Sequence, residues 1–395
     1  MTATDSELGV TFINALMDGR IGSLRVQGSV IASIDQNPQR GDRIVDLRGD
    51  RLLPGLINAH DHLQLNNLPA LEASKRYRHV KQWIDDIILR RRTDPDFEAR
   101  VTVARDARLF IGGIKNLLGG ATTVAHHDPL YPSLCLPDFP VAVLANYGWS
   151  HSLYIESEFD VSRACRATPD EWPWIIHAAE GLDEDAAAEF ERLDSLSCIQ
   201  ANTVLVHGVA LDQAQRRRLR RAQGALVWCP SSNLRLFGKT ADVEELAAYG
   251  RVALGTDSRL SGSNDLLEEL NLAGQSGRFD DAALESLVTS SSARILKLKD
   301  RGVLQVGLRA DLLILPAAAL LSNSTRADVR LIIVNGEARY GDADYAGAHS
   351  PQKPWTPIRV DGRRKVLLQR IAAQLSRLSA TEEGLVLPDR IEQAA

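Results

Sequence analysis

The chain has only four cysteines among its 395 residues, namely Cys135, Cys165, Cys198 and Cys229. They lie far apart and form no Cys-x-x-Cys pair, so the sequence predicts neither a disulfide framework nor a cysteine zinc site. We expect four reduced thiols, most of them buried.

The sequence also lacks any apolar run long enough to span a membrane, and its N-terminal segment lacks the basic start and apolar core of a signal peptide. Positive charge is not in excess, since the formal net charge is -5, whereas a nucleic-acid binder needs a basic surface. Five arginines between positions 216 and 221 are typical of a solvated helix face. We therefore expect a cytoplasmic protein with a small-molecule substrate and neither a membrane nor a nucleic acid as partner.

The most informative motif is His60-Asp61-His62, which ends the apolar run 52–59. Side chains two positions apart on a strand point the same way, so the two imidazoles can share one metal ion. Asp61 then faces the opposite side, toward a helix layer, where a buried carboxylate needs a partner.

Three later apolar runs end in the same manner, in residues able to bind a metal or move a proton. These are 174–180 with His177 and Glu180, 203–208 with His207, and 252–258 with Asp257. A (β/α)₈ barrel builds its active site at the carboxyl ends of its strands, so this order predicts a TIM barrel.

A further apolar run, 121–128, contains His126 and His127 and should form the third strand of the barrel. Adjacent residues on a strand face opposite ways, so one of the two histidines should point into the mouth of the barrel. A substrate contact and a structural role are both open for it.

The two ends of the chain carry short strand and turn patterns, whereas the middle alternates helical patterns with apolar runs. Residues 1–50 and 301–395 are predicted to form one composite β domain, and residues 51–300 the α/β barrel. A basic amphipathic helix is predicted over 362–379.

His60, His62, His177 and Asp257 together offer three neutral nitrogens and one carboxylate. This set suits one divalent ion per chain, zinc or ferrous iron, and leaves a position for water. Such an ion lowers the pKa of its water toward neutrality.

Three of the strand-end residues are candidates for proton transfer. Glu180 should carry a proton from water to a substrate nitrogen. His207 could polarise the group under attack, and Asp257 could act as both ligand and general base.

Contacts to the substrate are expected from residues near the strand ends. A tryptophan there could stack on a planar substrate, but packing in the core is the commoner role of each tryptophan. The candidates are Gln64, Asn66, Asn67, His126, His127, Trp228, Asn233, Ser258 and Arg259.

Several of these segments resemble motifs of the amidohydrolase superfamily, in particular its cytosine deaminase-like and chlorohydrolase-like branch. They are 53–62, 177–180, 206–208, 229–234, 255–258 and 307–312. The resemblance implies a mononuclear hydrolase whose TIM barrel is flanked by a small composite β-sandwich domain, and it allows a homo-oligomer. The fourth strand, near 141–147, has no lysine that could be carboxylated to bridge two metals. Asp61 and the triplet 126–128 depart from the family pattern.

The favoured function is hydrolytic deamination of an aminated heterocycle of purine, pyrimidine, pterin or triazine type. A metal-activated water adds to the ring carbon, Glu180 protonates a ring nitrogen, and ammonia leaves. One alternative is an amidohydrolase or chlorohydrolase acting on an amide or alkylamine C–N bond or a C–Cl bond. The second alternative is an inactive metal-binding relative, which would have no need of Glu180 and His207 as proton carriers.

Overall fold

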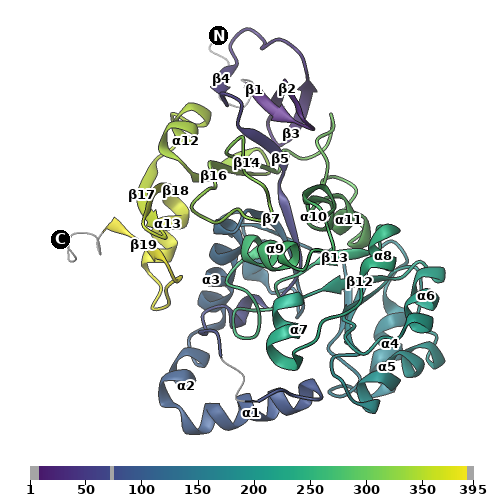
Figure 1. Cartoon of the computed structure of the whole chain (residues 1–395). Coiled ribbons are helices and arrows are strands. Elements are labelled where there is room, and N and C mark those ends of the chain that lie inside the picture. The colour runs from purple at the N-terminus through teal and green to yellow at the C-terminus, as the bar shows by residue number, and fades with distance from the viewer. Residues whose placement is uncertain (1–8, 72–74, 389–395) are drawn as a thin grey trace.

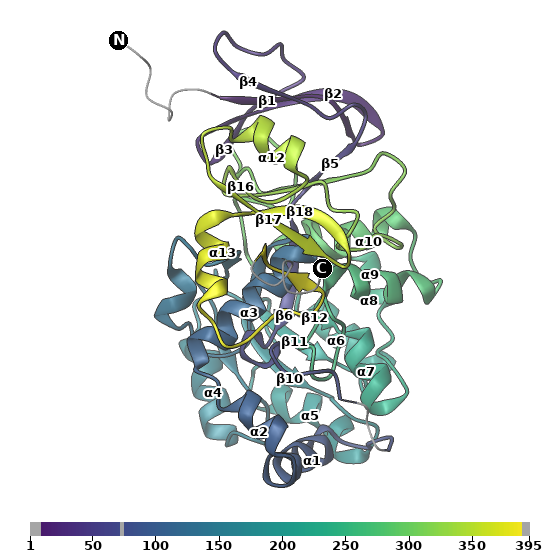
Figure 2. The same ribbon diagram turned by 90° about the vertical axis from the view of Figure 1, so that its left-hand side faces the viewer.

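The computed structural model describes residues 9–71 and 75–388 (Figure 1). The fold is mixed α/β, with one large sheet and two smaller sheets of parallel strands. Figure 2 shows the large sheet at one end of the molecule and the parallel strands, surrounded by helices, in the body below it.

The large sheet has eleven strands and draws them from both ends of the chain. The strands before the parallel sheets are β1 (Val10–Met17), β2 (Arg20–Gln27), β3 (Val30–Ile34), β4 (Arg43–Asp46) and β5 (Arg51–Pro54). Those after them are β14 (Leu312–Leu315), β15 (Leu331–Val334), β16 (Glu337–Gly341), β17 (Trp355–Val360), β18 (Arg363–Leu368) and β19 (Leu385–Val386). Antiparallel pairing of β5 with β14 joins the two groups. The two ends of the chain therefore share one sheet.

The parallel strands form one set of three and one set of five. The first set is β6 (Leu56–Asp61), β7 (Ala121–His126) and β8 (Ala142–Val143), and the second is β9 (Gly148–Ser150), β10 (Trp174–Ala178), β11 (Thr203–His207), β12 (Ala225–Trp228) and β13 (Val252–Leu254). A single parallel bridge between Asp61 and Asp257 links the sets.

The strand β7 pairs directly with β6, so it is the second parallel strand and its predicted third place was wrong. In the described part of the connection between them the chain forms the helices η1, α1, α2 and α3 and no strand. The run near 141–147 accordingly contains the third strand, β8, while the fourth is β9, which has no lysine.

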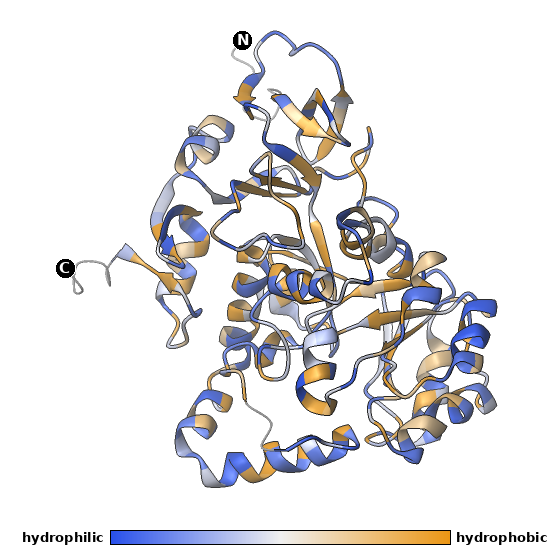
Figure 3. Ribbon diagram, in the orientation of Figure 1, coloured by the Kyte–Doolittle hydropathy of each residue, from blue (hydrophilic) through white to orange (hydrophobic). Residues whose placement is uncertain are grey.

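Helices follow most of the parallel strands, and Figure 3 shows hydrophobic strands inside a layer of helices with hydrophilic outer faces. Those in the first half are η1 (Leu63–Leu65), α1 (Val80–Thr93), α2 (Pro95–Val101), α3 (Arg105–Leu118), η2 (Pro132–Cys135), α4 (Glu158–Ala167) and α5 (Glu184–Ser195). Those in the second half are α6 (Gln213–Arg221), α7 (Pro230–Phe237), α8 (Glu244–Ala248), α9 (Leu266–Gln275), α10 (Asp281–Val288), α11 (Ser290–Ile295), α12 (Ala343–His349) and α13 (Gln369–Ser376). None of the helices in the described ranges is long and apolar enough to cross a membrane.

The arginine cluster lies on α6, where its side chains pair with acidic residues of neighbouring helices. Arg218 pairs with Glu191 and Asp194 of α5, and Arg216 pairs with Asp242. These exposed pairs confirm the prediction of a solvated helix face. The cysteines are also as expected, since all four are free and all except Cys135 are buried.

The helix predicted over 362–379 was wrong in its first half. Residues 363–368 form β18, which pairs with β17 across the two-residue turn Asp361-Gly362. Both turn residues have positive φ, 47° and 79°, which is the geometry of a tight hairpin turn and is favoured by the Asp-Gly sequence. The turn therefore determines the local structure, and only α13 is helical.

Candidate active site

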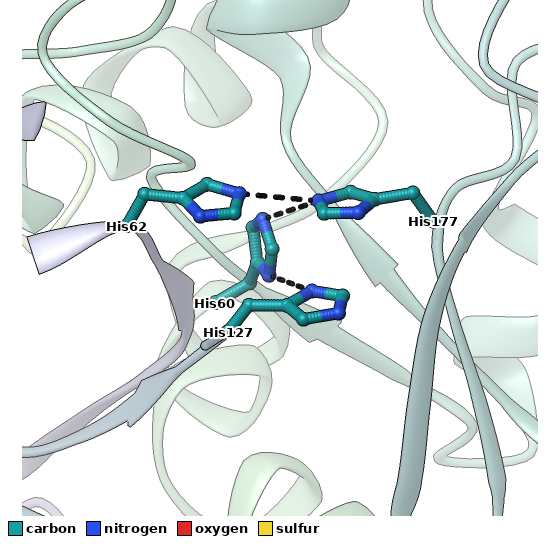
Figure 4. A group of neighbouring side chains, drawn as sticks. All are labelled: His60, His62, His127 and His177. Carbon is teal, nitrogen blue, oxygen red and sulfur yellow. Dashed lines mark hydrogen bonds between the residues drawn. The ribbon is translucent and has the colours of Figure 1, made fainter. Parts of the chain in front are cut away.

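A buried cluster of histidines lies where β6, β7 and β10 end (Figure 4). His60 and His62 come from the end of β6, and His177 comes from β10. The Nε2 atom of His177 lies 3.2 Å from Nε2 of His62 and 3.3 Å from Nε2 of His60. Three ring nitrogens therefore point at one spot.

Hydrogen bonds on the outer side of His62 and His177 determine which nitrogen carries the proton. Nδ1 of His62 lies 3.1 Å from a carboxylate oxygen of Asp128, and Nδ1 of His177 lies 2.8 Å from the carbonyl oxygen of His151. Both partners are acceptors, so each Nδ1 must donate. The Nε2 lone pairs are then free and directed inward.

His60 is oriented in the same way through His127, the residue after β7. Nε2 of His127 lies 2.9 Å from the carbonyl oxygen of Ser150, so that nitrogen donates. Nδ1 of His127 is therefore an acceptor, and it lies 3.3 Å from Nδ1 of His60, which donates to it. The Nε2 lone pair of His60 is left free toward the centre of the cluster.

This arrangement fits a tetrahedral metal site. Two nitrogens bound to zinc at about 2.0–2.1 Å with a tetrahedral angle lie about 3.3 Å apart, close to the separations found here. Burial lowers the pKa of His60 to about 4 and that of His177 well below its usual value, so both are neutral donors. Burial acts in the same direction on His62, but the Asp128 carboxylate outweighs it and raises the pKa. A metal ion at this position would displace that proton.

Asp257 follows β13 and completes the donor set with an oxygen. Its Oδ1 lies 3.7 Å from Nε2 of His60 and 3.8 Å from Nε2 of His62. Its Oδ2 accepts hydrogen bonds from the hydroxyls of Ser232 at 2.7 Å and Ser261 at 2.6 Å. Burial opposes ionisation, but the neighbouring histidines, His60 first, lower the pKa of Asp257, so it is a carboxylate.

Glu180 and His207 face each other beside this cluster, with Oε1 of Glu180 3.5 Å from Nε2 of His207. Burial, with the nearby carboxylates of Asp257 and Glu189, raises the pKa of Glu180 well above its usual value. Nδ1 of His207 lies 2.9 Å from Oδ1 of Asn233, so Nδ1 donates and Nε2 is an acceptor. A protonated Glu180 can therefore donate to His207 or to a substrate.

Backbone strain is concentrated at two of these residues. His207 has φ of 73° and Asp257 has φ of 58°, a left-handed conformation that non-glycine residues seldom adopt. Such conformations persist where the surrounding structure holds them and are common at functional sites.

A cavity of about 190 Å³ opens onto the cluster. Its polar lining includes Gln64, Asp128, His151, Tyr154 and Ser258, in addition to the site residues His62, His177, Glu180, His207 and Asp257. One wall is apolar and includes Val80, Trp83 and Ile84 of α1. The carboxylates of Asp128 and Asp257 line it, so the cavity favours a neutral or cationic ligand.

The comparisons with known proteins agree with this geometry. A model of the amidohydrolase family matches residues 165–339. A 5-methylthioadenosine/S-adenosylhomocysteine deaminase of Pelotomaculum thermopropionicum is 31% identical over 41% of this chain and 44% of that protein. One of Pyrococcus furiosus is 22% identical over 81% of this chain and 91% of that protein. The resemblance of the chain to the amidohydrolase superfamily is confirmed.

Solved structures of two hydrolases share the fold. An atrazine chlorohydrolase of Arthrobacter aurescens, complexed with zinc, superposes with a TM-score of 0.66 at 17% identity, over 83% of this chain and 94% of the other. An adenosine deaminase of Xanthomonas campestris with bound zinc has a TM-score of 0.68 at 19% identity, over 84% of this chain and 92% of the other. The expectation of a hydrolase acting on carbon–nitrogen bonds is confirmed at the level of the family.

Not every residue proposed as a substrate contact lies at the cavity. Gln64 and Ser258 line it. Trp228 is buried in the core, where its indole N–H donates to Thr240 at 2.6 Å, and Asn233 supports His207 instead. His127 contacts His60, whereas Nδ1 of His126 lies 3.4 Å from the backbone N–H of Leu63 on the other side of β7. Asn66, Asn67 and Arg259 are buried outside the cavity lining.

Asp128 and His151 are among the cavity residues that were not expected from the sequence. His151 follows β9, a strand of only three residues, too short to give a clear pattern in the sequence. Asp128 follows His127, and its role depends on His62, which is far away in the sequence. Gln64 donates to the same Asp128 oxygen at 2.6 Å. These contacts, with burial opposing them, lower the pKa of Asp128 to about 2, so it is a carboxylate at neutral pH.

Asp61 faces away from the histidines, as expected, and is fully buried. One of its oxygens accepts from Asn116 at 2.7 Å and from the Lys115 ammonium at 3.2 Å, both on α3. Its other oxygen accepts from Asn66 at 2.7 Å. Asp61 thus connects the histidine-bearing strand to α3 and to the loop that follows the strand.

Proposed function

We propose that this amidohydrolase is a hydrolytic deaminase of an aminated heterocycle that works with one divalent metal ion. The observation that carries the proposal is the position of Glu180, a buried acid with a raised pKa at the wall of a cavity where three imidazole lone pairs converge. Hydrolysis of the bond between a ring carbon and its amino group needs such an acid to protonate the ring nitrogen as charge develops there.

The fold that would support this chemistry is a (β/α)₈ barrel formed by β6 to β13, within residues 51–300. In support, the eight parallel strands pair in chain order within each set, and the Asp61–Asp257 bridge joins the first strand to the segment after the last. Residues 1–50 and 301–395 would form the composite β-sandwich domain with the C-terminal helix. A homo-oligomer and a cytoplasmic location remain proposals from the sequence and the resemblance.

His60, His62, His177 and Asp257 would hold the ion, zinc or ferrous iron. When bound, it would lower the pKa of a coordinated water so that hydroxide is available at neutral pH. His127 is excluded as a ligand because both of its ring nitrogens already have partners, His60 and the Ser150 carbonyl.

The two carboxyl groups of the site would divide the proton transfers between them. Glu180 and Asp257 have pKa values shifted in opposite directions, which is the usual sign of an acid and a base in one site. Asp257 would accept the proton from the attacking water and deliver it to the amino group, which leaves as ammonia, and Glu180 would protonate the ring nitrogen. His207, held by Asn233, would keep the Glu180 carboxyl oriented toward the substrate.

The leaving group is what separates the favoured function from its alternatives. Ammonia is supported by two proteins similar to this chain, a 5-methylthioadenosine/S-adenosylhomocysteine deaminase and an adenosine deaminase. Hydrolysis of an amide, an alkylamine or a C–Cl bond could use the same residues, and a solved neighbour is an atrazine chlorohydrolase. An inactive metal-binding relative would have no use for the Glu180–His207 pair.

The test combines metal content with ammonia release from aminopurines, aminopyrimidines, pterins and aminotriazines. We expect about one zinc or iron per chain and ammonia release that falls by about 10²–10⁴ in Glu180→Gln. Glu184→Gln, an exposed glutamate at the start of α5, is the matched control and should retain activity. Metal without ammonia, but with release of chloride or amine, would favour the alternative hydrolases.

A further inference from the structure

Glu382, in the C-terminal segment after α13, is buried close to the active-site loops although it is far from them in sequence. Its side chain is fully shielded from solvent. Its Oε1 accepts hydrogen bonds from Arg259 at 2.5 Å and from Arg326 at 2.8 Å. In Figure 2 the yellow segment that follows α13 turns down toward the parallel strands. A buried carboxylate with two arginines is stable only while both pairings persist.

The position of Glu382 is itself fixed by a contact with the large sheet. Arg326 also binds the carboxylate of Asp361, in the turn between β17 and β18, with its Nε at 3.0 Å and its Nη2 at 2.7 Å. Because a two-pronged contact of this kind fixes the guanidinium plane, Arg326 gives Glu382 a defined position.

Arg259, the other partner, lies two residues after Asp257. Its backbone N–H donates to Oδ1 of Asn66 at 2.9 Å, and its Nη1 donates to the Asn66 carbonyl oxygen at 2.9 Å. Asn66 in turn donates to Asp61, between the two histidines of β6. Arg259 therefore ties the loop after β13 to the loop after β6.

The loop that carries Arg259 shapes both the carboxylate and the cavity. Ser261 donates to Oδ2 of Asp257 at 2.6 Å, leaving Oδ1 toward the histidines. Ser258, Leu260 and Ser261 all line the cavity. A displacement of Arg259 would move these residues with it, since they flank it in one short loop.

We propose that Glu382 is a positioning residue of the active site, acting through Arg259 on the loop 257–263. Its carboxylate fixes the Arg259 side chain, Arg259 fixes the loop, and Ser261 then orients Asp257 toward the three imidazoles. The C-terminal segment is thereby part of the catalytic apparatus and not merely a cover on it. This inference rests on the proposed metal site and hydrolytic function.

The test compares Glu382→Gln with Glu383→Gln, the adjacent and exposed glutamate, in the full-length protein. Zinc affinity is measured by competition with a chelator in the absence of substrate, and kcat and KM are measured on the zinc-loaded protein. We expect Glu382→Gln to weaken zinc binding and to lower kcat, each by about 10-fold, the usual effect of losing a group that orients metal ligands. Glu383→Gln should match the wild type in both.

A second variant keeps the test decisive if Glu382→Gln does not fold. Arg259→Lys retains the charge, but lysine lacks the planar fork that bridges Glu382 and Asn66, so the same loss of zinc affinity and kcat is expected. A lowered melting temperature with unchanged zinc affinity and kcat would overturn the proposal, because Glu382 would then be structural only. Zinc binding without turnover of any heterocycle in the wild type would instead contradict the proposed function, while the affinity comparison would still decide the role of Glu382.

Discussion

The Nε2 atoms of His62 and His177 lie 3.2 Å apart, and when both rings are neutral neither Nε2 carries a proton. Each ring donates its Nδ1 proton outward, to the Asp128 carboxylate and to the His151 carbonyl oxygen. Two lone pairs therefore face each other in a buried site, an arrangement that a cation between them stabilises.

Replacing His177 by Ala should remove the metal. We expect zinc affinity to fall by at least about 100-fold, since one of the converging nitrogens is lost. The measurement is chelator competition followed by metal analysis. His349→Gln, at a buried histidine of α12 remote from the cluster, should retain full zinc content; equal zinc loss in both variants would count against the site.

Asn233→Ala should lower kcat by about 10-fold with little change in zinc content. Without the Asn233 oxygen, the proton of His207 is no longer held on Nδ1, so the lone pair that faces Glu180 is present only part of the time. Steady-state kinetics with the substrate found in the ammonia screen provide the measurement. Asn323→Ala, at an exposed asparagine, is the control. Unchanged kcat in Asn233→Ala would mean that His207 needs no orientation.

Asp61→Asn should destabilise the metal-free protein by about 3–5 kcal/mol, because it leaves the Lys115 ammonium buried without its carboxylate. The measurement is urea unfolding followed by circular dichroism. Adding Lys115→Met should recover part of the loss, since the unpaired charge is then gone. If the double variant is no more stable than Asp61→Asn, the ion pair is not the cause.

Glu269 should make the stability of the protein fall as the pH rises. Burial raises the pKa of this fully buried residue to about 7, although hydrogen bonds from Ser231 oppose the shift. The folded state therefore retains a proton that the unfolded state releases near pH 4.5. The contribution of Glu269 to the free energy of unfolding is complete below about pH 4.5. This contribution falls by about 3 kcal/mol as the pH rises to about 7.

Urea unfolding of the metal-free protein at pH 5 and pH 7.5 checks this slope, with Glu269→Gln as the comparison. The variant has no carboxyl group to titrate at this position, so its stability should change less between the two pH values. A parallel pH dependence in both proteins would assign the proton to another group, for example Glu189, whose pKa burial also raises to about 7.

Much of the site could be predicted because parallel strands end at one edge of their sheets. His60, His62, His177, His207 and Asp257 each end or directly follow a short apolar run, and the structure brings all five together. The pattern was weaker where a strand is very short. β9 has three residues, so His151 behind it was missed, and β7 was assigned one place too late in the strand order.

Local patterns also failed where a turn decides the structure. The spacing of apolar residues over 362–379 is compatible with a helix, but Asp361-Gly362 forms a hairpin turn and the following residues pair with β17. Pairing within the large sheet thus overrides a helical periodicity, because it satisfies a whole row of backbone groups at once.

The sequence by itself determined which donor atoms are available, the resemblance to a superfamily and the order of the parallel strands after β9, because all three depend on residues close together in the chain. Only the tertiary structure decided which nitrogen of each histidine faces inward, that His127 and not His126 supports the cluster, and that Lys115 and Asn116 hold Asp61. These features depend on partners brought together from distant segments. A proton sits on one nitrogen or the other according to what lies beside it in space.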